Sequence, residues 1–89
     1  MKEDAMTPAT ILIVEDEAIV AADLASKLRQ LGHEVVGTTG TGQDAVAMAC
    51  RLRPQVVLMD IWLKGPMDGV EAAASIRQRH NVPVIYLTA

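Results

Sequence analysis

Short, continuously apolar runs alternate along this chain with segments whose apolar positions recur at helical spacing. The runs Ile11–Val14 and Val56–Met59 contain no polar residue, and each ends abruptly in acid, at Glu15 and Asp16 in one case and at Asp60 in the other. Strands without polar alternation are typical of a parallel sheet that helices cover on both faces. We therefore predict two buried strands that deliver carboxylates to their C-terminal ends.

Two further strands and a first helix follow from the same pattern. Residues 34–38 and 82–88 predict strands, with Pro83 tolerated at the beginning of the second. A helix is predicted from Ala18, and Gly32 supplies a left-handed stop after it. The apolar stripe of this helix comprises Val20, Leu24, Leu28 and Leu31.

Two more helices are indicated by their N-terminal residues. Thr41-Gly42-Gln43-Asp44 resembles a capping box, with Asp44 where Glu or Gln is usual, and it opens a helix that reaches Leu52 before Pro54. Asp68-Gly69-Val70-Glu71 is a second capping box and opens a helix to about Arg79. Both helices are therefore expected to start at defined residues.

Strands and helices alternate four and three times along the 89 residues. This order predicts right-handed crossovers and an α/β fold, a doubly wound parallel sheet with helices on both faces. A chain of this length can hold one small domain. We expect residues 1–9 to form a flexible lead-in and residues 10–89 to form the domain.

Composition and charge narrow the function classes. The formal net charge is −3 and no basic stripe is present, which argues against direct nucleic-acid binding. Cys50 is the only cysteine, which excludes an internal disulfide and a cysteine metal cage, and its helical position predicts a buried structural thiol. No apolar run reaches the length of a membrane span and no signal-peptide pattern is present, so no membrane partner and a cytoplasmic location are expected.

The acids at the strand ends carry the candidate chemistry. Asp60 alone could equally begin a turn, and Glu15 and Asp16 could simply favour the N-terminus of the next helix. If the two buried strands are neighbours, however, the three carboxylates converge and need a hard divalent cation, for which Mg²⁺ is the natural candidate. An Asp beside such an ion can accept a phosphoryl group, and Thr88 could donate a hydrogen bond to it.

Four motifs together resemble the receiver domain of bacterial two-component response regulators. They are Ile11-Leu12-Ile13-Val14-Glu15-Asp16-Glu17, Val57-Leu58-Met59-Asp60, Met67-Asp68-Gly69 and Val84-Ile85-Tyr86-Leu87-Thr88-Ala89. The resemblance covers residues 10–89. It implies a flavodoxin-like fold with strand order 2-1-3-4 and a phosphoryl-accepting signalling domain that is not an enzyme beyond self-phosphorylation and self-dephosphorylation.

The resemblance also implies a role for each site residue. Asp60 is the phospho-acceptor and takes its phosphoryl group from a phosphohistidine on a sensor histidine kinase or histidine phosphotransfer protein. Glu15, Asp16, Asp60 and the backbone carbonyl of Trp62 hold Mg²⁺. Thr88 is the switch hydroxyl, and the small side chain of Ala89 leaves the phosphoryl site accessible.

Two departures from the family pattern affect these expectations. The loop from Asp60 to Gly69 is one residue longer than is common, with Lys64-Gly65-Pro66 in place of a Met-Pro pair. Receivers also continue into a fourth helix, a fifth strand with a phosphoryl-contacting Lys, and a fifth helix, which this sequence lacks. We therefore expect impaired phosphorylation of this chain, and a homodimer or swapped oligomer formed through the exposed edge of the fourth strand.

Other function classes remain open at this stage. A phosphatase of the haloacid dehalogenase type also uses a strand-end Asp, but it requires a second Asp where this chain has Trp62. Nucleotide binding by the glycine-rich segment 37–42 is weakly supported, because that segment matches no phosphate-binding motif. A docking module that is never phosphorylated is the third alternative.

Overall fold

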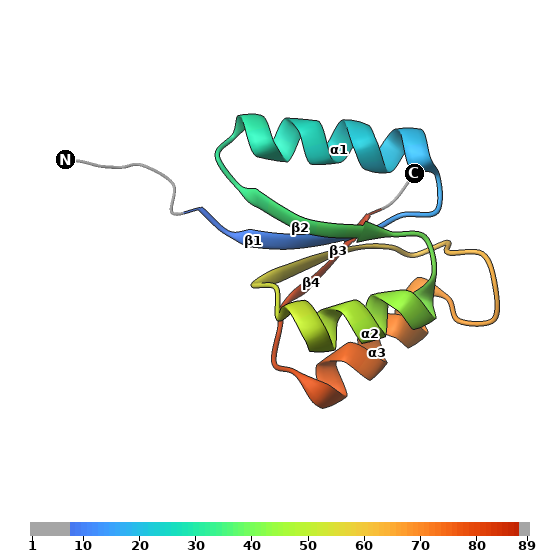
Figure 1. Cartoon of the computed structure of the whole chain (residues 1–89). Helices are drawn as coiled ribbons and strands as arrows, with labels where there is room; N and C mark the ends of the chain where they lie inside the picture. Colours follow the sequence, from blue (N-terminus) through green and yellow to red (C-terminus); the bar gives the residue numbers. More distant parts are fainter. Residues whose placement is uncertain (1–7, 88–89) are drawn as a thin grey trace.

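The computed structural model describes residues 8–87 of the chain. Residues 1–7 of the expected lead-in lie outside this range, as do Thr88 and Ala89. Seven elements alternate strictly between strand and helix (Figure 1). They are β1 (Thr10–Val14), α1 (Ala18–Gln30), β2 (Glu34–Thr39), α2 (Gly42–Leu52), β3 (Val56–Asp60), α3 (Gly69–Arg79) and β4 (Val84–Leu87).

The four strands form one parallel sheet in the order β2-β1-β3-β4, which confirms the predicted α/β fold and strand order. Helix α1 covers one face of the sheet, and α2 and α3 lie side by side on the other (Figure 1). Strands β1 and β3 are direct neighbours, with Val14 opposite Met59. The carboxyl ends of the two central strands therefore meet at one edge of the sheet.

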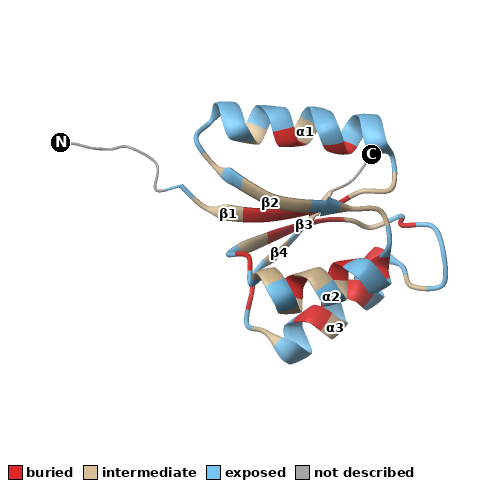
Figure 2. Cartoon of the chain, in the orientation of Figure 1, coloured by how far each residue is buried: buried red, intermediate tan, exposed pale blue. Residues whose placement is uncertain are grey.

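The two faces of the sheet are packed unequally. Ten buried residues form the core beneath α2 and α3, including Leu12, Met59 and Ile76. Five form the core beneath α1, and two of these are the alanines Ala21 and Ala25. Figure 2 shows the result, a helix α1 that is exposed over most of its surface and an α2–α3 layer in which buried and half-buried positions are more frequent.

The apolar stripe predicted for α1 is only partly correct. Leu24 and Leu28 pack against the core, but Val20 is 42% exposed and Leu31 62% exposed. The buried positions are Ala21 and Ala25, which the stripe omitted. Small side chains there let the helix lie close to the sheet, and this rotates the leucine and valine stripe partly toward solvent.

The helix ends agree better with the sequence pattern. Asp68 and Glu71 form a complete capping box at the start of α3, with hydrogen bonds of 2.9 and 3.0 Å. At α2 the Thr41 hydroxyl accepts from the Asp44 N–H at 3.2 Å. Gly32 has a φ of 94° directly after α1, as its predicted stop requires. Cys50, expected to be buried, is only half-buried because it lies at the side of α2 rather than on the face toward the sheet.

Candidate phosphoryl-acceptor and metal site

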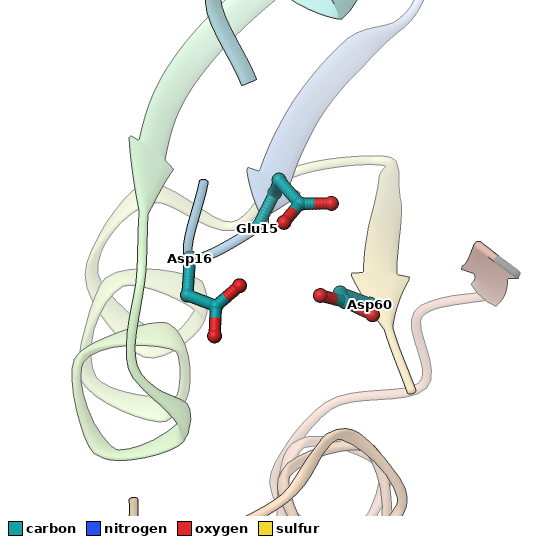
Figure 3. Close-up of side chains that lie close together, drawn as sticks. All are labelled: Glu15, Asp16 and Asp60. Atoms are coloured by element: carbon teal, nitrogen blue, oxygen red, sulfur yellow. The ribbon is translucent and has the colours of Figure 1, made fainter. Parts of the chain in front are cut away.

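Three carboxylates converge at the carboxyl ends of the central strands (Figure 3). Glu15 and Asp16 directly follow β1, and Asp60 is the last residue of β3. One carboxylate oxygen from each side chain lies within 4.8 Å of the others. All three residues are half-buried. The pairing of β1 with β3 thus brings together the acids that the sequence separates by more than forty positions.

Backbone N–H groups orient each of these carboxylates. Oε2 of Glu15 accepts from the N–H of Glu17 at 3.0 Å, and Oδ1 of Asp60 accepts from the N–H of Trp62 at 2.9 Å. Oδ2 of Asp16 accepts from the N–H of Lys64 at 3.1 Å. Each side chain is therefore oriented by one N–H, and its carboxylate oxygens keep lone pairs that can serve as ligands.

The surroundings of Glu15 raise the pKa of its carboxyl. Burial raises the pKa of this carboxyl above its ordinary value, and the charge of Asp60 and hydrogen bonding with the Asp16 and Asp60 side chains raise it further. The N–H of Glu17 opposes these effects on the pKa by stabilising the charged form. Oxygen ligands that repel one another in this way suit a divalent cation, because the ion removes the repulsion.

Close backbone packing supports the site from below. A Cβ on Gly69 would overlap the carbonyl oxygen of Asp60, so the first turn of α3 approaches the end of β3 more closely than any side chain allows. Gly69 also donates its N–H to the carbonyl of Ile61 at 3.3 Å. The capping-box motif predicts Gly69 at the start of α3 but not this contact, since nothing local to the motif reveals which backbone lies against it.

A groove of about 550 Å³ extends from the acids along α1 toward the end of β4. Val20 and Leu24 of α1 and Leu87 of β4 contribute apolar surface to it. The loop after β3 contributes Trp62, whose side chain is 73% exposed, and Lys64. Trp62 therefore lies beside the acids, and the role of its carbonyl as a ligand stays a prediction. Thr88 and Ala89 lie outside the described residues.

The glycine-rich segment 37–42 is accounted for by packing. A Cβ on Gly37 would lie 2.6 Å from Cε of Met48, and one on Gly42 would lie 2.8 Å from the Met67 carbonyl oxygen. Gly42 is the first residue of α2, and Met67 covers it. These glycines allow elements to approach one another, which removes the motivation for the nucleotide-binding alternative.

The model of the response regulator receiver domain family matches residues 11–89. The chain belongs to this family. Receiver domains are signalling modules, and this membership favours the receiver interpretation over the phosphatase alternative. The family and fold expected from the four sequence motifs are thus confirmed.

Named relatives agree with this assignment. The chain is 45% identical over 87 residues to the transcriptional regulatory protein PdtaR of Mycobacterium tuberculosis, covering 97% of this chain and 42% of that protein. It also resembles the solved receiver domain of a modulated diguanylate cyclase from Desulfovibrio desulfuricans G20, with a TM-score of 0.87 and 43% identity over 93% of this chain and 66% of that one. The receiver chain therefore spans less than half the length of PdtaR.

A third relative was solved with a protein partner. It is the anti-anti-sigma factor PhyR from Bartonella quintana, in complex with the anti-sigma factor NepR. The TM-score is 0.82 and the identity 35%, over 89% of this chain and 33% of that one.

None of the helices within residues 8–87 has the length and apolar character needed to cross a membrane.

Proposed function

We propose that this receiver accepts a phosphoryl group on Asp60 in a Mg²⁺-dependent reaction. The observation that carries the proposal is the convergence of Glu15, Asp16 and Asp60, whose ligand oxygens lie within 4.8 Å of one another. An acid cluster of this kind at the carboxyl ends of central parallel strands occupies the position where open α/β sheets bind ligands.

The residues present fit a magnesium ion. Glu15, Asp16 and Asp60 would hold it, with the backbone carbonyl of Trp62 as a further ligand. Burial raises the pKa of Glu15 most, and the charge of Asp60 adds a repulsion that a cation relieves. Bound Mg²⁺ supplies positive charge that offsets the negative charge on the oxygens of the transferring phosphoryl group.

Asp60 acts as the nucleophile in this proposal. Its Oδ1 is held by the Trp62 N–H, which fixes the carboxylate plane and leaves Oδ2 available to attack phosphorus. A bond forms between Asp60 and phosphorus while the P–N bond to the donor histidine breaks, and the imidazole leaves with the bonding electrons. The roles expected for the Thr88 hydroxyl and for Ala89 remain predictions.

The proposed phosphodonor is a sensor histidine kinase or a histidine phosphotransfer protein. Two large apolar residues are exposed to solvent, Ile19 at 85% and Trp62 at 73%, and Trp62 lines the groove that contains the acids. Ile19 lies in the first turn of α1 and Trp62 in the loop after β3. An exposed apolar residue such as Trp62 beside a reactive carboxylate suits a protein donor that must bring its histidine close.

Mass spectrometry after incubation with acetyl phosphate tests the reaction. We expect one added phosphoryl group on the wild-type chain in the presence of Mg²⁺, none in the presence of a chelator, and none in the Asp60→Asn variant. A wild-type chain that stays unlabelled, or an Asp60→Asn variant that is labelled equally, would overturn the proposal.

Self-association through β4 is proposed in addition. Within residues 8–87, β4 pairs with β3 on one side only, and its Ile85 side chain is exposed. An open apolar edge strand can pair with a second copy.

We expect light scattering to detect a dimer or larger assembly of the wild-type chain at high concentration. Ile85→Lys should be monomeric, and the control Val70→Lys, which changes an exposed residue of α3, should still associate.

A monodisperse wild-type monomer at high concentration would contradict this expectation. Equal association of the two lysine variants would show that the contact lies elsewhere.

A docking role without phosphorylation is the second candidate. It is favoured by the similarity to PhyR, which was solved in complex with the anti-sigma factor NepR, and by the exposed Trp62 beside the site. Mg²⁺-dependent labelling of Asp60 separates the two candidates, because a docking module requires none.

A further inference from the structure

The loop between β3 and α3 carries a lysine to the edge of the acid site. Leu63 is buried in the core beneath α2 and α3, which anchors the loop from one side. The adjacent Lys64 donates its backbone N–H to Oδ2 of Asp16, which anchors it from the other. Gly65 then turns the chain away with a φ of 101°. The backbone of Lys64 is thus tied to one of the three carboxylates.

Lys64 borders the same groove as the acids. Lys64 lines the groove that also contains Glu15, Asp16 and Asp60. Lys27 of α1 lines this groove too, but its ammonium already pairs with Asp23 at 2.9 Å. Lys27 is thus paired with a carboxylate of its own helix, whereas Lys64 extends from a loop that is hydrogen-bonded to Asp16.

The charge of the site explains why a lysine matters there. Three carboxylates and a divalent cation together carry a net negative charge, and a phosphoryl donor is itself an anion. Such a donor is repelled unless a further cation lies close to the oxygens of its phosphoryl group. An ammonium on a flexible four-carbon stem can follow the phosphoryl group as it approaches.

We propose that the Lys64 ammonium binds the dianionic phosphoryl group of the donor at the Asp60 site. This role rests on the proposed phosphorylation of Asp60, and it makes Lys64 a residue that recognises the phosphoryl group of the donor. With acetyl phosphate, an Asp60 oxygen attacks phosphorus and the P–O bond to the acetyl group breaks. Acetate leaves with the bonding electrons, and Lys64 stays protonated throughout.

Rates of Asp60 labelling with acetyl phosphate test the role of Lys64. Below saturation, Lys64→Ala should be labelled about tenfold more slowly than wild type, as expected for the loss of one charge-assisted hydrogen bond. Lys64→Arg should restore most of the rate, because it keeps the charge. Lys27→Ala, which removes the same charge from a paired lysine, should change the rate less than about twofold.

Two controls separate this effect from a structural one. Alanine retains the backbone N–H that binds Asp16, so Lys64→Ala should unfold at the temperature of wild type. Its Mg²⁺ affinity, followed by the fluorescence of Trp62, should be unchanged or slightly higher. Raising the salt concentration should slow wild type more than Lys64→Ala, because screening weakens the attraction that the variant already lacks.

The possible outcomes distinguish the two proposals. If the wild-type chain is not labelled, the proposed function fails and the role of Lys64 fails with it. If wild type is labelled on Asp60 and Lys64→Ala matches Lys27→Ala, the proposed function stands and the role of Lys64 is overturned. Loss of Mg²⁺ affinity in Lys64→Ala would also overturn it, since the lysine would then act through the metal ligands.

Discussion

The two layers that cover the sheet differ in how they are built. Helices α2 and α3 share a continuous core with the sheet, and both begin at residues whose side chains cap them. Helix α1 contacts the sheet through two buried alanines and two half-buried leucines, has no side-chain cap at Glu17, and borders the groove that leads to the acids. The fold is thus anchored mainly on one face, while the surface open to a partner lies mainly on the other.

This difference explains how the site can be both fixed and accessible. Asp60 is attached to the well-packed layer through Gly69, whereas Glu15 and Asp16 lead directly into α1. The acceptor therefore has rigid support, and the residues beside it remain free to contact a donor. The predictions that follow test the contrast, from the largest expected effect to the smallest.

Truncation of core residues should expose the difference in packing. Ile76 is a fully buried residue of α3, so Ile76→Ala should lower the free energy of unfolding by about 2–5 kcal/mol. Leu28 of α1 is only partly buried, and Leu28→Ala should lower the free energy of unfolding by about 1 kcal/mol. Urea denaturation measures both values. Equal losses would show that the two layers contribute alike.

An added methyl group should disturb the acceptor on its rigid side. Gly69→Ala forces the Asp60 carbonyl to move, and we expect a loss of about 1–3 kcal/mol in stability together with weaker Mg²⁺ binding. Gly40→Ala is the matched control, because a Cβ there lies 3.4 Å from Cα of Asp16 and needs only a small adjustment. Thermal unfolding and a Mg²⁺ titration of both variants would settle whether Gly69 positions the site.

Substitutions at the N-caps of α3 and α1 should show the same difference between the two layers, with smaller losses of stability. Asp68→Ala removes the hydrogen bond to the Glu71 N–H and should cost about 1 kcal/mol. Glu17→Ala at the start of α1 should change stability very little, because Glu17 makes no capping hydrogen bond. Denaturation midpoints of the two variants provide the comparison. A larger effect at Glu17 would contradict it.

The smallest predicted effect is a pH dependence that originates at Glu15. Its pKa is raised in the folded chain, so the folded state binds more protons than the unfolded state, and metal-free stability should fall as pH rises from about 4.5 through the raised pKa. Glu15→Gln should remove this component. Mg²⁺ should stabilise wild type increasingly over the same range, since it binds the charged form. Parallel pH profiles of wild type and Glu15→Gln without metal would refute the assignment.

Much of the fold could be predicted because it is written in local patterns. Continuous apolar runs marked β1 and β3, and the Asp68–Glu71 capping box marked the start of α3. The apolar stripe predicted for α1 was partly wrong because helical spacing does not reveal which of two adjacent faces of the helix packs on the sheet. Ala21 and Ala25 are the buried positions because small side chains let the helix lie close to the sheet.

The sequence by itself determined the residue types at the site and their place at strand ends, because an apolar run ending in acid has few structural interpretations. Tertiary structure decided what those residues contact. The pairing of β1 with β3 set the carboxylate distances, and the path of the loop after β3 placed Lys64 against Asp16. These contacts join residues far apart in the chain, so they depend on how the layers pack, and no local pattern encodes that.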